Sequence, residues 1–242
     1  MVSRLEFTCS AGRELPVEVR RRKGTRHLRL RLNVQNRIVV SAPWHCSDRT
    51  CRDFIERNRE WLEGQLKQAP QVVGIREWLQ RSPGLTVDGQ QLPVRIRESD
   101  SDRAICRLDH QSKQVEMLLP TGADDALLYA LLRQFAGKIV AARAHELAQR
   151  LGLRPGRISV RDQSSRWGSC SAHKNISLNW RLMLLPPPLQ DYVIFHELAH
   201  LTEMNHSRRF WDLLERYDPE RRRHEAELDA LSPALMRVSI PA

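Results

Sequence analysis

Alternating apolar and basic residues near the start of the chain predict a β-rich region. Residues 28–32 place three leucines on one side and two arginines on the other, which is the period-two pattern of a half-buried strand. Residues 38–40 form a second apolar run, and Gln35-Asn36 between the runs is typical of a turn. Pro43 ends the second run. We therefore expect two strands here.

A helix is predicted to follow these strands. Ser47 is a typical N-cap residue, and apolar positions then recur at spacings of three and four residues as far as Leu66. The predicted face consists of Cys51, Phe54, Ile55, Asn58, Trp61, Leu62 and Leu66.

The rest of the chain combines short strands with two helical patterns. Residues 122–151 predict a long helix that Gly152 ends, and the prolines at 186–188 favour the start of another helix. The expected strands are 103–108, 115–119, 158–160 and 175–185. The fold class is therefore α+β, with an N-terminal β-rich region over residues 1–122 that includes a helix, and a second domain over residues 123–242.

The charge of the chain is concentrated near its N-terminus. The 39 basic and 29 acidic residues give a net charge of +10, and only five of the basic residues are lysines. Residues 1–70 carry 15 basic and 8 acidic residues, which leaves +7 in this segment. Arginine favours phosphate and carboxylate partners. A basic face that binds nucleic acid or another acidic partner explains this pattern, and so does a solvated outer face of a sheet.

Other features of the composition exclude several classes of protein. No apolar run approaches the roughly 18–20 residues that span a bilayer, so we expect no membrane partner. The first residues do not resemble a cleaved secretion signal, and we expect a cytoplasmic protein. The five scattered cysteines favour neither a disulfide framework nor a zinc ribbon. The oligomeric state stays open.

Residues 196–200 carry the clearest chemical signal. They read His-Glu-Leu-Ala-His, which is the HExxH arrangement. Because His196 and His200 lie one helical turn apart, their imidazoles can bind one metal ion. Glu197 is offset by one residue, so its carboxylate can reach a water on the metal and act as its base.

A catalytic zinc usually has a third protein ligand. His206 follows the motif at the spacing found in metzincins, although Glu203 stands where those proteins have glycine. A His206 ligand requires the helix to end by about residue 205, where Asn205 tolerates a left-handed conformation. Ser207 is a suitable cap for a new helix. If the first helix continued, Glu203 would be the rival ligand. We expect His206 to complete a site for one Zn²⁺ per chain.

Four stretches resemble the YgjP-like metallopeptidase family in order and spacing. They are RWGSCS (166–171), ISLNWRL (176–182), DYVIFHELAHL (191–201) and NHSRRFW (205–211). The resemblance implies that residues 123–242 form a compact, zincin-like helix–sheet–helix core related to SprT-like and Spartan-like proteases. It also implies metal ligands at His196, His200 and His206 and a general base at Glu197. It does not supply a substrate.

The resemblance gives further residues a physical interpretation. We expect the strand 175–185 to lie beside the active helix and pair with an extended substrate, with the Trp180 side chain in the core. We expect Gly168 to lie in a tight turn near the metal and to permit a close backbone approach. His224, in an arginine-rich helix, is expected at a solvated position.

The sequence is consistent with three functions. The leading hypothesis is a zinc-dependent peptidase that acts on a peptide or protein substrate. A metal-dependent nucleotide or phosphoester hydrolase is the second, because the arginine excess suits phosphate. The third is a nucleic-acid-associated binding module with a structural metal. Glu197 separates the third from the first two, since a structural site needs the histidines but not this carboxylate.

Overall fold

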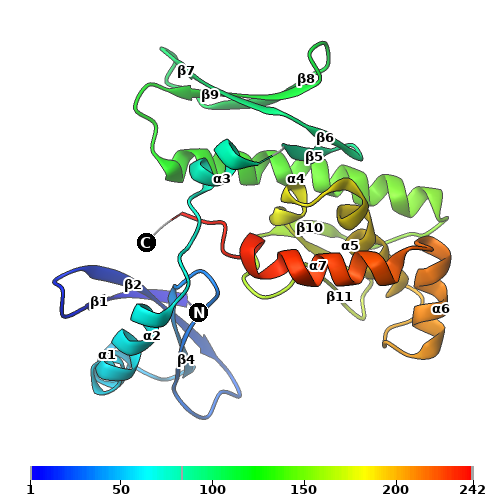
Figure 1. The fold of residues 1–242 in the computed structure, drawn as a ribbon. Helices are drawn as coiled ribbons and strands as arrows, with labels where there is room; N and C mark the ends of the chain where they lie inside the picture. The colour runs from blue at the N-terminus through cyan, green and yellow to red at the C-terminus, as the bar shows by residue number, and fades with distance from the viewer. Residues whose placement is uncertain (1, 83, 241–242) are drawn as a thin grey trace. The chain divides into compact units, whose positions relative to one another are not determined.

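The computed structural model describes residues 2–82 and 84–240, and its chain forms two compact units (Figure 1). One unit extends to Val72, and the other comprises Val73–Ile240. The expected boundary at residues 122 and 123 differs from this division. The strands between residues 85 and 120 share a core with the helix that follows them, so they belong to the second unit. The α+β fold class is confirmed, since helices and strands both occur in each unit.

The first unit is a mixed four-stranded sheet with two helices on its core side. The sheet order is β1-β2-β4-β3, in which β2 and β4 run parallel and the other neighbours run antiparallel. Leucine, valine and isoleucine from alternate strand positions meet Cys51, Ile55 and Leu62 of the helices. The elements are β1 (Val2–Thr8), β2 (Glu14–Arg22), β3 (Arg29–Leu32), β4 (Ile38–Pro43), α1 (Asp48–Arg57) and α2 (Arg59–Gln68).

The single helix expected after Ser47 is two helices. Ser47 caps α1 as predicted, because its side chain accepts a hydrogen bond from the Thr50 amide. The chain bends at Asn58, and this residue separates α1 from α2. The face that the 3.6-residue period predicts therefore does not continue. Trp61, expected in the core, is 45% exposed.

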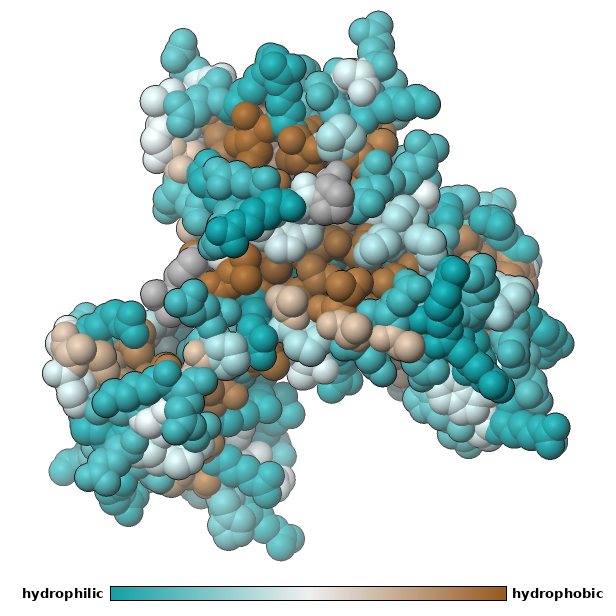
Figure 2. All heavy atoms as spheres, viewed as in Figure 1, coloured by the Kyte–Doolittle hydropathy of each residue, from teal (hydrophilic) through white to brown (hydrophobic). Residues whose placement is uncertain are grey.

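The second unit begins with a small sheet packed on a long helix. Strands β8 and β9 form the expected antiparallel pair, and β7 adds to β9 in parallel. Apolar residues from these strands and from the β5–β6 hairpin share one core with α4, and Figure 2 shows apolar side chains gathered under this sheet. The elements are α3 (Ile75–Arg81), β5 (Leu85–Val87), β6 (Gln90–Leu92), β7 (Val94–Ser99), β8 (Ile105–Asp109), β9 (Gln114–Pro120) and α4 (Asp125–Arg150).

A second three-stranded sheet and three helices complete this unit. The sheet order is β10-β12-β11, with β11 at an edge. Helix α5 contacts β11, and α7 packs along α5 (Figure 1). Among the described residues, no helix is both long and apolar enough to cross a membrane. The elements are β10 (Ile158–Arg161), β11 (Gly168–Cys170), β12 (Ile176–Asn179), a 3-10 helix (Trp180–Leu184), α5 (Pro187–Ala199), α6 (Arg208–Tyr217) and α7 (Arg221–Leu235).

The strand expected over 175–185 is much shorter and occupies a different position. It ends at Asn179 and is the central strand of its sheet, so both of its edges are already paired. Residues 180–184 form the 3-10 helix, in which Trp180 is buried as predicted but Arg181 is fully buried as well. A strand would have sent these two neighbours to opposite faces.

Arg181 is buried because every part of its guanidinium group has a partner. Its Nη1 lies 2.8 Å from the Asp162 carboxylate, and Nε and Nη2 donate to the Val238 carbonyl at 3.0 and 2.8 Å. Asp162 also accepts hydrogen bonds from Tyr129 and from the Trp180 indole. This network ties α4, the 3-10 helix and the end of the chain around one buried ion pair.

His224 is also paired rather than solvated. It is 6% exposed, and its Nδ1 lies 2.6 Å from Oδ2 of Asp218, which precedes α7. The expectation that this histidine faces solvent was wrong. The arginines next to it in sequence suggested an exposed position, but His224 lies on the buried side of α7.

Candidate metal centre

The chain turns sharply after the HExxH motif and returns toward it. Helix α5 ends at Ala199, and His200 is its C-cap residue. A short turn and loop follow, and α6 begins at Arg208 with Ser207 as its N-cap residue. The helix therefore ends before residue 205, as a third histidine ligand requires. Asn205 does not adopt the expected left-handed conformation, because the break occurs upstream of it.

This return brings three histidines together. Ligand atoms of His196, His200 and His206 all lie within 4.8 Å of one another. Nε2 of His206 and Nε2 of His196 are 2.9 Å apart. The group contains no carboxylate, so Glu203 is not part of it.

Glu203 contacts the cluster through its backbone instead. Its carbonyl oxygen lies 3.0 Å from Nδ1 of His200. When Nδ1 carries the hydrogen, it donates to this carbonyl and leaves Nε2 of His200 with a free lone pair. A hydrogen bond at the second ring nitrogen fixes the orientation and tautomer of a ligating imidazole. Glu203, which the sequence offered as an alternative ligand, thus positions His200 through its backbone carbonyl.

The ring of Phe210 packs against all three imidazoles. This fully buried ring has its centroid 4.9 Å from that of His196, 4.6 Å from that of His200 and 4.7 Å from that of His206. The ring is roughly parallel to His200 and edge-on to the other two. Phe210 shares the buried face of α6 with Leu213 and Leu214, and this apolar spacing carries no signal of the contact with the histidines.

Two of the three imidazoles are buried in a way that favours their neutral form. Burial, together with the neighbouring His200 and His206, lowers the pKa of His196 to about 4. Burial also lowers the pKa of His200. Metal ions bind the deprotonated ring nitrogen, so these environments favour the ligand form of His196 and His200.

Glu197 lies beside the cluster in an unusually enclosed position. It is 6% exposed, and its Oε2 has no hydrogen-bond partner among the described residues. Burial, against an opposing effect of Arg166, raises the pKa of its carboxyl to about 8. A cation held by the histidines would stabilise the carboxylate and reduce this shift.

Gly168 makes this enclosure possible. A Cβ atom at residue 168 would stand 2.5 Å from Oε1 of Glu197. The close approach expected of this glycine is therefore present, although Gly168 begins strand β11 rather than lying in a tight turn. The edge strand and the α5 carboxylate are in direct contact.

Comparison with known proteins agrees with this geometry. A family model described as the YgjP-like metallopeptidase domain matches residues 26–231. The chain belongs to this YgjP-like family. Neither the curated proteins nor the solved structures gave a match. Family membership supports a metal-dependent peptidase, and thus a hydrolase that acts on peptide or protein substrates.

A pocket of the YgjP-like domain opens beside Glu197 and His196. It has a volume of about 220 Å³ and is lined by residues from β11, α5 and α7. Two of them are the carboxylates Glu225 and Asp229 of α7, which the sequence analysis did not single out. The lining residues are Trp167, Gly168, Tyr192, Val193, His196, Glu197, Glu225, Leu228 and Asp229. Glu225 also forms an ion pair with Arg221 at 3.7 Å, so the negative charge on this wall of the cleft comes mainly from Asp229.

Two side-chain contacts position the elements around this YgjP-like site. Trp167 donates a hydrogen bond of 2.7 Å from its indole nitrogen to Ser232 of α7. Arg143 of α4 donates to both oxygens of Asp191, at 2.9 and 2.5 Å, and so anchors the middle of α5. A two-point contact between guanidinium and carboxylate restricts orientation as well as distance.

Proposed function

We propose that this YgjP-like domain is a zinc-dependent peptidase in which His196, His200 and His206 bind one Zn²⁺ and Glu197 is the general base. One observation carries the proposal. Three imidazoles converge within 4.8 Å, next to a buried carboxylate whose Oε2 has no partner in the described residues. A purely structural site needs the imidazoles but gains nothing from an unpaired buried carboxylate.

The donor set favours zinc. Three imidazoles are a donor set of catalytic zinc sites, and a zinc ion held by them would keep a position open for a water or a substrate. When bound, such an ion acts as a Lewis acid toward a carbonyl oxygen and makes a water molecule more acidic.

The role of Glu197 is to move one proton. Its carboxylate accepts a proton from the attacking water at the unpartnered Oε2 and then donates that proton to the nitrogen of the departing amine. Because Gly168 closes one side of the carboxylate, Glu197 has little freedom to swing away from the pocket. The surrounding protein thus positions the base before substrate binds.

Strand β11 replaces the strand expected over 175–185 as the substrate-binding edge. It pairs with β12 on one side and is the last strand of its sheet. An extended peptide can add to such an edge by backbone hydrogen bonds. Gly168 at its start would place the peptide backbone beside Glu197.

The pocket also favours one class of substrate. Glu225 and Asp229 line it together with Glu197, and the lining residues include no lysine or arginine, although Arg221 outside the lining is 3.7 Å from Glu225. Opposite charge at short range stabilises a bound side chain and repels acidic ones. The proposed substrate is therefore a cytoplasmic peptide or unfolded protein with lysine or arginine near the scissile bond.

Metal content tests the ligand assignment. Protein purified without chelators under reducing conditions should contain about one zinc per chain by mass spectrometry of the metal. His206→Ala should lose it, whereas Glu203→Ala should keep it, because the backbone carbonyl that contacts His200 remains. Loss of zinc in Glu203→Ala and its retention in His206→Ala would contradict the assignment.

Activity tests the reaction. A peptide library should be cleaved by the wild-type protein and not by Glu197→Gln, although that variant should still bind zinc. Nucleoside triphosphates provide the second arm of this experiment. If they are hydrolysed in a Glu197-dependent manner while peptides stay intact, the reaction is phosphoester hydrolysis and the peptidase proposal fails.

A further inference from the structure

The outer face of the first unit's sheet carries a dense group of arginines. Alternation along β2 sends Arg20 and Arg22 to this face, while Arg21 between them points to the core side and donates to the Cys46 carbonyl at 2.7 Å. Arg29 and Arg31 are the exposed positions of β3. The amphipathic pattern read from the sequence thus produces a face with arginines on two strands.

Strand register places these arginines in rows. Arg20 of β2 lies opposite Ser41 of β4, and Ser41 lies opposite Arg29 of β3. The three side chains therefore form one row across three strands, with a hydroxyl group between two guanidinium groups. Arg31 lies two residues beyond Arg29, so it is about 7 Å further along the same strand.

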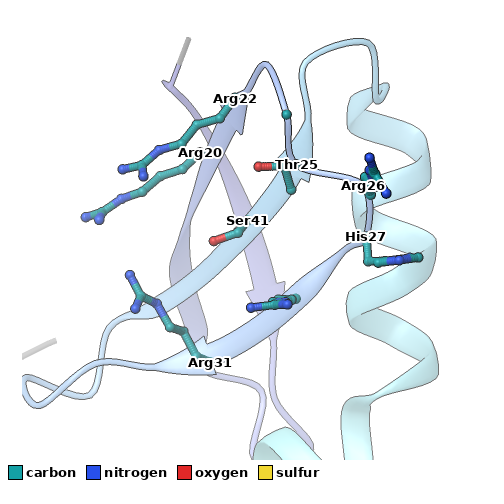
Figure 3. A pocket seen from close by; sticks show the side chains of 9 residues that line it. Arg20, Arg22, Thr25, Arg26, His27, Arg31 and Ser41 are labelled. Carbon is teal, nitrogen blue, oxygen red and sulfur yellow. The ribbon is translucent and has the colours of Figure 1, made fainter.

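These side chains surround a hollow of about 480 Å³. Figure 3 shows Arg20 and Arg22 extending side by side from β2, with Ser41 between them and Arg31. Arg26 and His27 lie on the loop that leads to β3. No acidic, tryptophan, tyrosine or phenylalanine side chain is among the lining residues, which are Arg20, Arg22, Gly24, Thr25, Arg26, His27, Arg29, Arg31 and Ser41.

Most of these positive charges are not neutralised by the protein. Arg20 forms a two-point ion pair with Glu18, at 2.7 and 3.0 Å. Within the described residues, the four other arginines of the hollow have no ion-pair partner; they are Arg22, Arg26, Arg29 and Arg31. Like charges held this close repel one another, so an anion that binds several of them at once is strongly favoured.

We propose that this hollow binds the phosphodiester backbone of a nucleic acid, independently of sequence. The planar guanidinium group donates two parallel hydrogen bonds to a phosphate, and Ser41 and Thr25 can add single ones. Arginines spread over two strands and a loop fit a chain with successive phosphates better than a single anion. The hollow offers no large aromatic ring on which bases could stack, so the contacts are made to the backbone.

Salt dependence measures these contacts directly. The logarithm of the affinity for single-stranded DNA falls with the logarithm of salt concentration with a slope of about −0.7 per neutralised phosphate. Fluorescence anisotropy with two unrelated 20-nucleotide oligonucleotides, from 50 to 200 mM NaCl, gives this slope. Arg29→Gln/Arg31→Gln should bind both oligonucleotides about 10-fold more weakly and with a slope shallower by about 1.4.

A charge-matched variant separates this site from general positive charge. Arg52 and Arg57 are exposed on α1, which packs on the opposite face of the sheet. Arg52→Gln/Arg57→Gln removes the same two charges and should bind like the wild type. Equal weakening by both double variants would overturn the site. All four changed side chains are exposed, and a thermal unfolding curve for each variant confirms that it folds.

Two further outcomes also overturn the proposal. Absence of oligonucleotide binding at 50 mM NaCl is one. The other is complete competition by inorganic triphosphate or by polyglutamate at the concentration of the oligonucleotide phosphates, which would assign the hollow to a small phosphate or to an acidic peptide. Glu197→Gln should bind the oligonucleotides unchanged, so this inference stands or falls separately from the peptidase proposal.

Discussion

The backbone of Gly168 lies in contact with the side chain of Glu197. A Cβ atom at residue 168 would stand 2.5, 2.6 and 2.7 Å from Oε1, Cγ and Cδ of Glu197, which is closer than real Cβ contacts. The edge strand and the general base proposed on α5 thus constrain each other. Any side chain at residue 168 would displace Glu197 or the strand that carries residue 168.

We predict that Gly168→Ala displaces the carboxylate. Because Glu197 is buried, its side chain cannot swing out freely, and strand β11 or α5 must shift. The expected cost is about 1–3 kcal/mol in stability, as for other overpacked sites. A shift of about 1 Å in a catalytic group lowers the turnover rate by about 100-fold. Peptide hydrolysis and zinc content, measured together, should show lost activity with the metal retained.

Gly137→Ala provides the matched control. Gly137 lies inside α4, and an added Cβ would meet nothing within 4 Å. Alanine in a helix interior is about 1 kcal/mol more stable than glycine. This variant should therefore unfold at a higher temperature than the wild type and keep full activity. If both glycine variants behave alike, the contact with Glu197 has no role in the reaction.

Phe210→Leu should weaken metal binding more than it weakens the fold. The substitution removes the ring that lies within 5 Å of all three imidazoles but keeps an apolar side chain on the buried face of α6. Changes to groups that orient metal ligands typically reduce metal affinity by about 10–100-fold. Competition with a zinc-binding dye measures the affinity, and thermal unfolding of the metal-free protein measures the fold.

Phe135→Leu separates the two effects. Phe135 belongs to the same apolar core but lies on α4, and it forms no ring contact with the histidines. It should lose a similar amount of stability while its zinc affinity stays within a factor of two of the wild type. A parallel loss of affinity in Phe135→Leu would mean that Phe210 acts only through general stability.

The sequence was most informative where a local pattern decides the structure. The spacing of His196, His200 and His206 predicted that one turn and a chain reversal would bring the three rings together, and the reversal is present. The long helix ending before Gly152 and the β8–β9 pair also follow from local periodicity. Each depends on residues that are close in sequence.

The failures come from contacts between distant residues. Alternating apolar residues beyond Asn179 predicted a continued strand, but Arg181 turns inward to meet Asp162, 19 positions away. The local pattern of apolar residues does not indicate that Asp162 is the partner of Arg181. The carboxylates of Glu225 and Asp229 were missed for the same reason, because only the packing of α7 along α5 brings them to the pocket.

These two carboxylates predict charge selectivity. Glu225→Gln/Asp229→Asn should lower kcat/KM for peptides with lysine near the scissile bond by about 10-fold, since each lost close charge contact weakens binding of a cation. The value for the same peptides with glutamine in place of lysine should change little. Paired peptide sets compare the two values. A uniform loss on both sets would indicate a general disturbance of the site rather than selectivity.

Asp162→Asn should destabilise the second unit in a pH-dependent manner. Burial alone raises the pKa of Asp162, but Arg181 and the Tyr129 hydroxyl outweigh it and hold that pKa below its ordinary value. A lowered pKa contributes stability above about pH 4, the unfolded value, and this contribution is lost as the pH falls through the folded value. Removing the charge leaves Arg181 buried and unpaired at a cost of about 3–5 kcal/mol.

Urea unfolding should therefore show a large difference between wild type and variant at pH 7 that shrinks below pH 4. A difference that stays constant from pH 7 to pH 3 would show that the carboxylate charge of Asp162 is not what compensates Arg181.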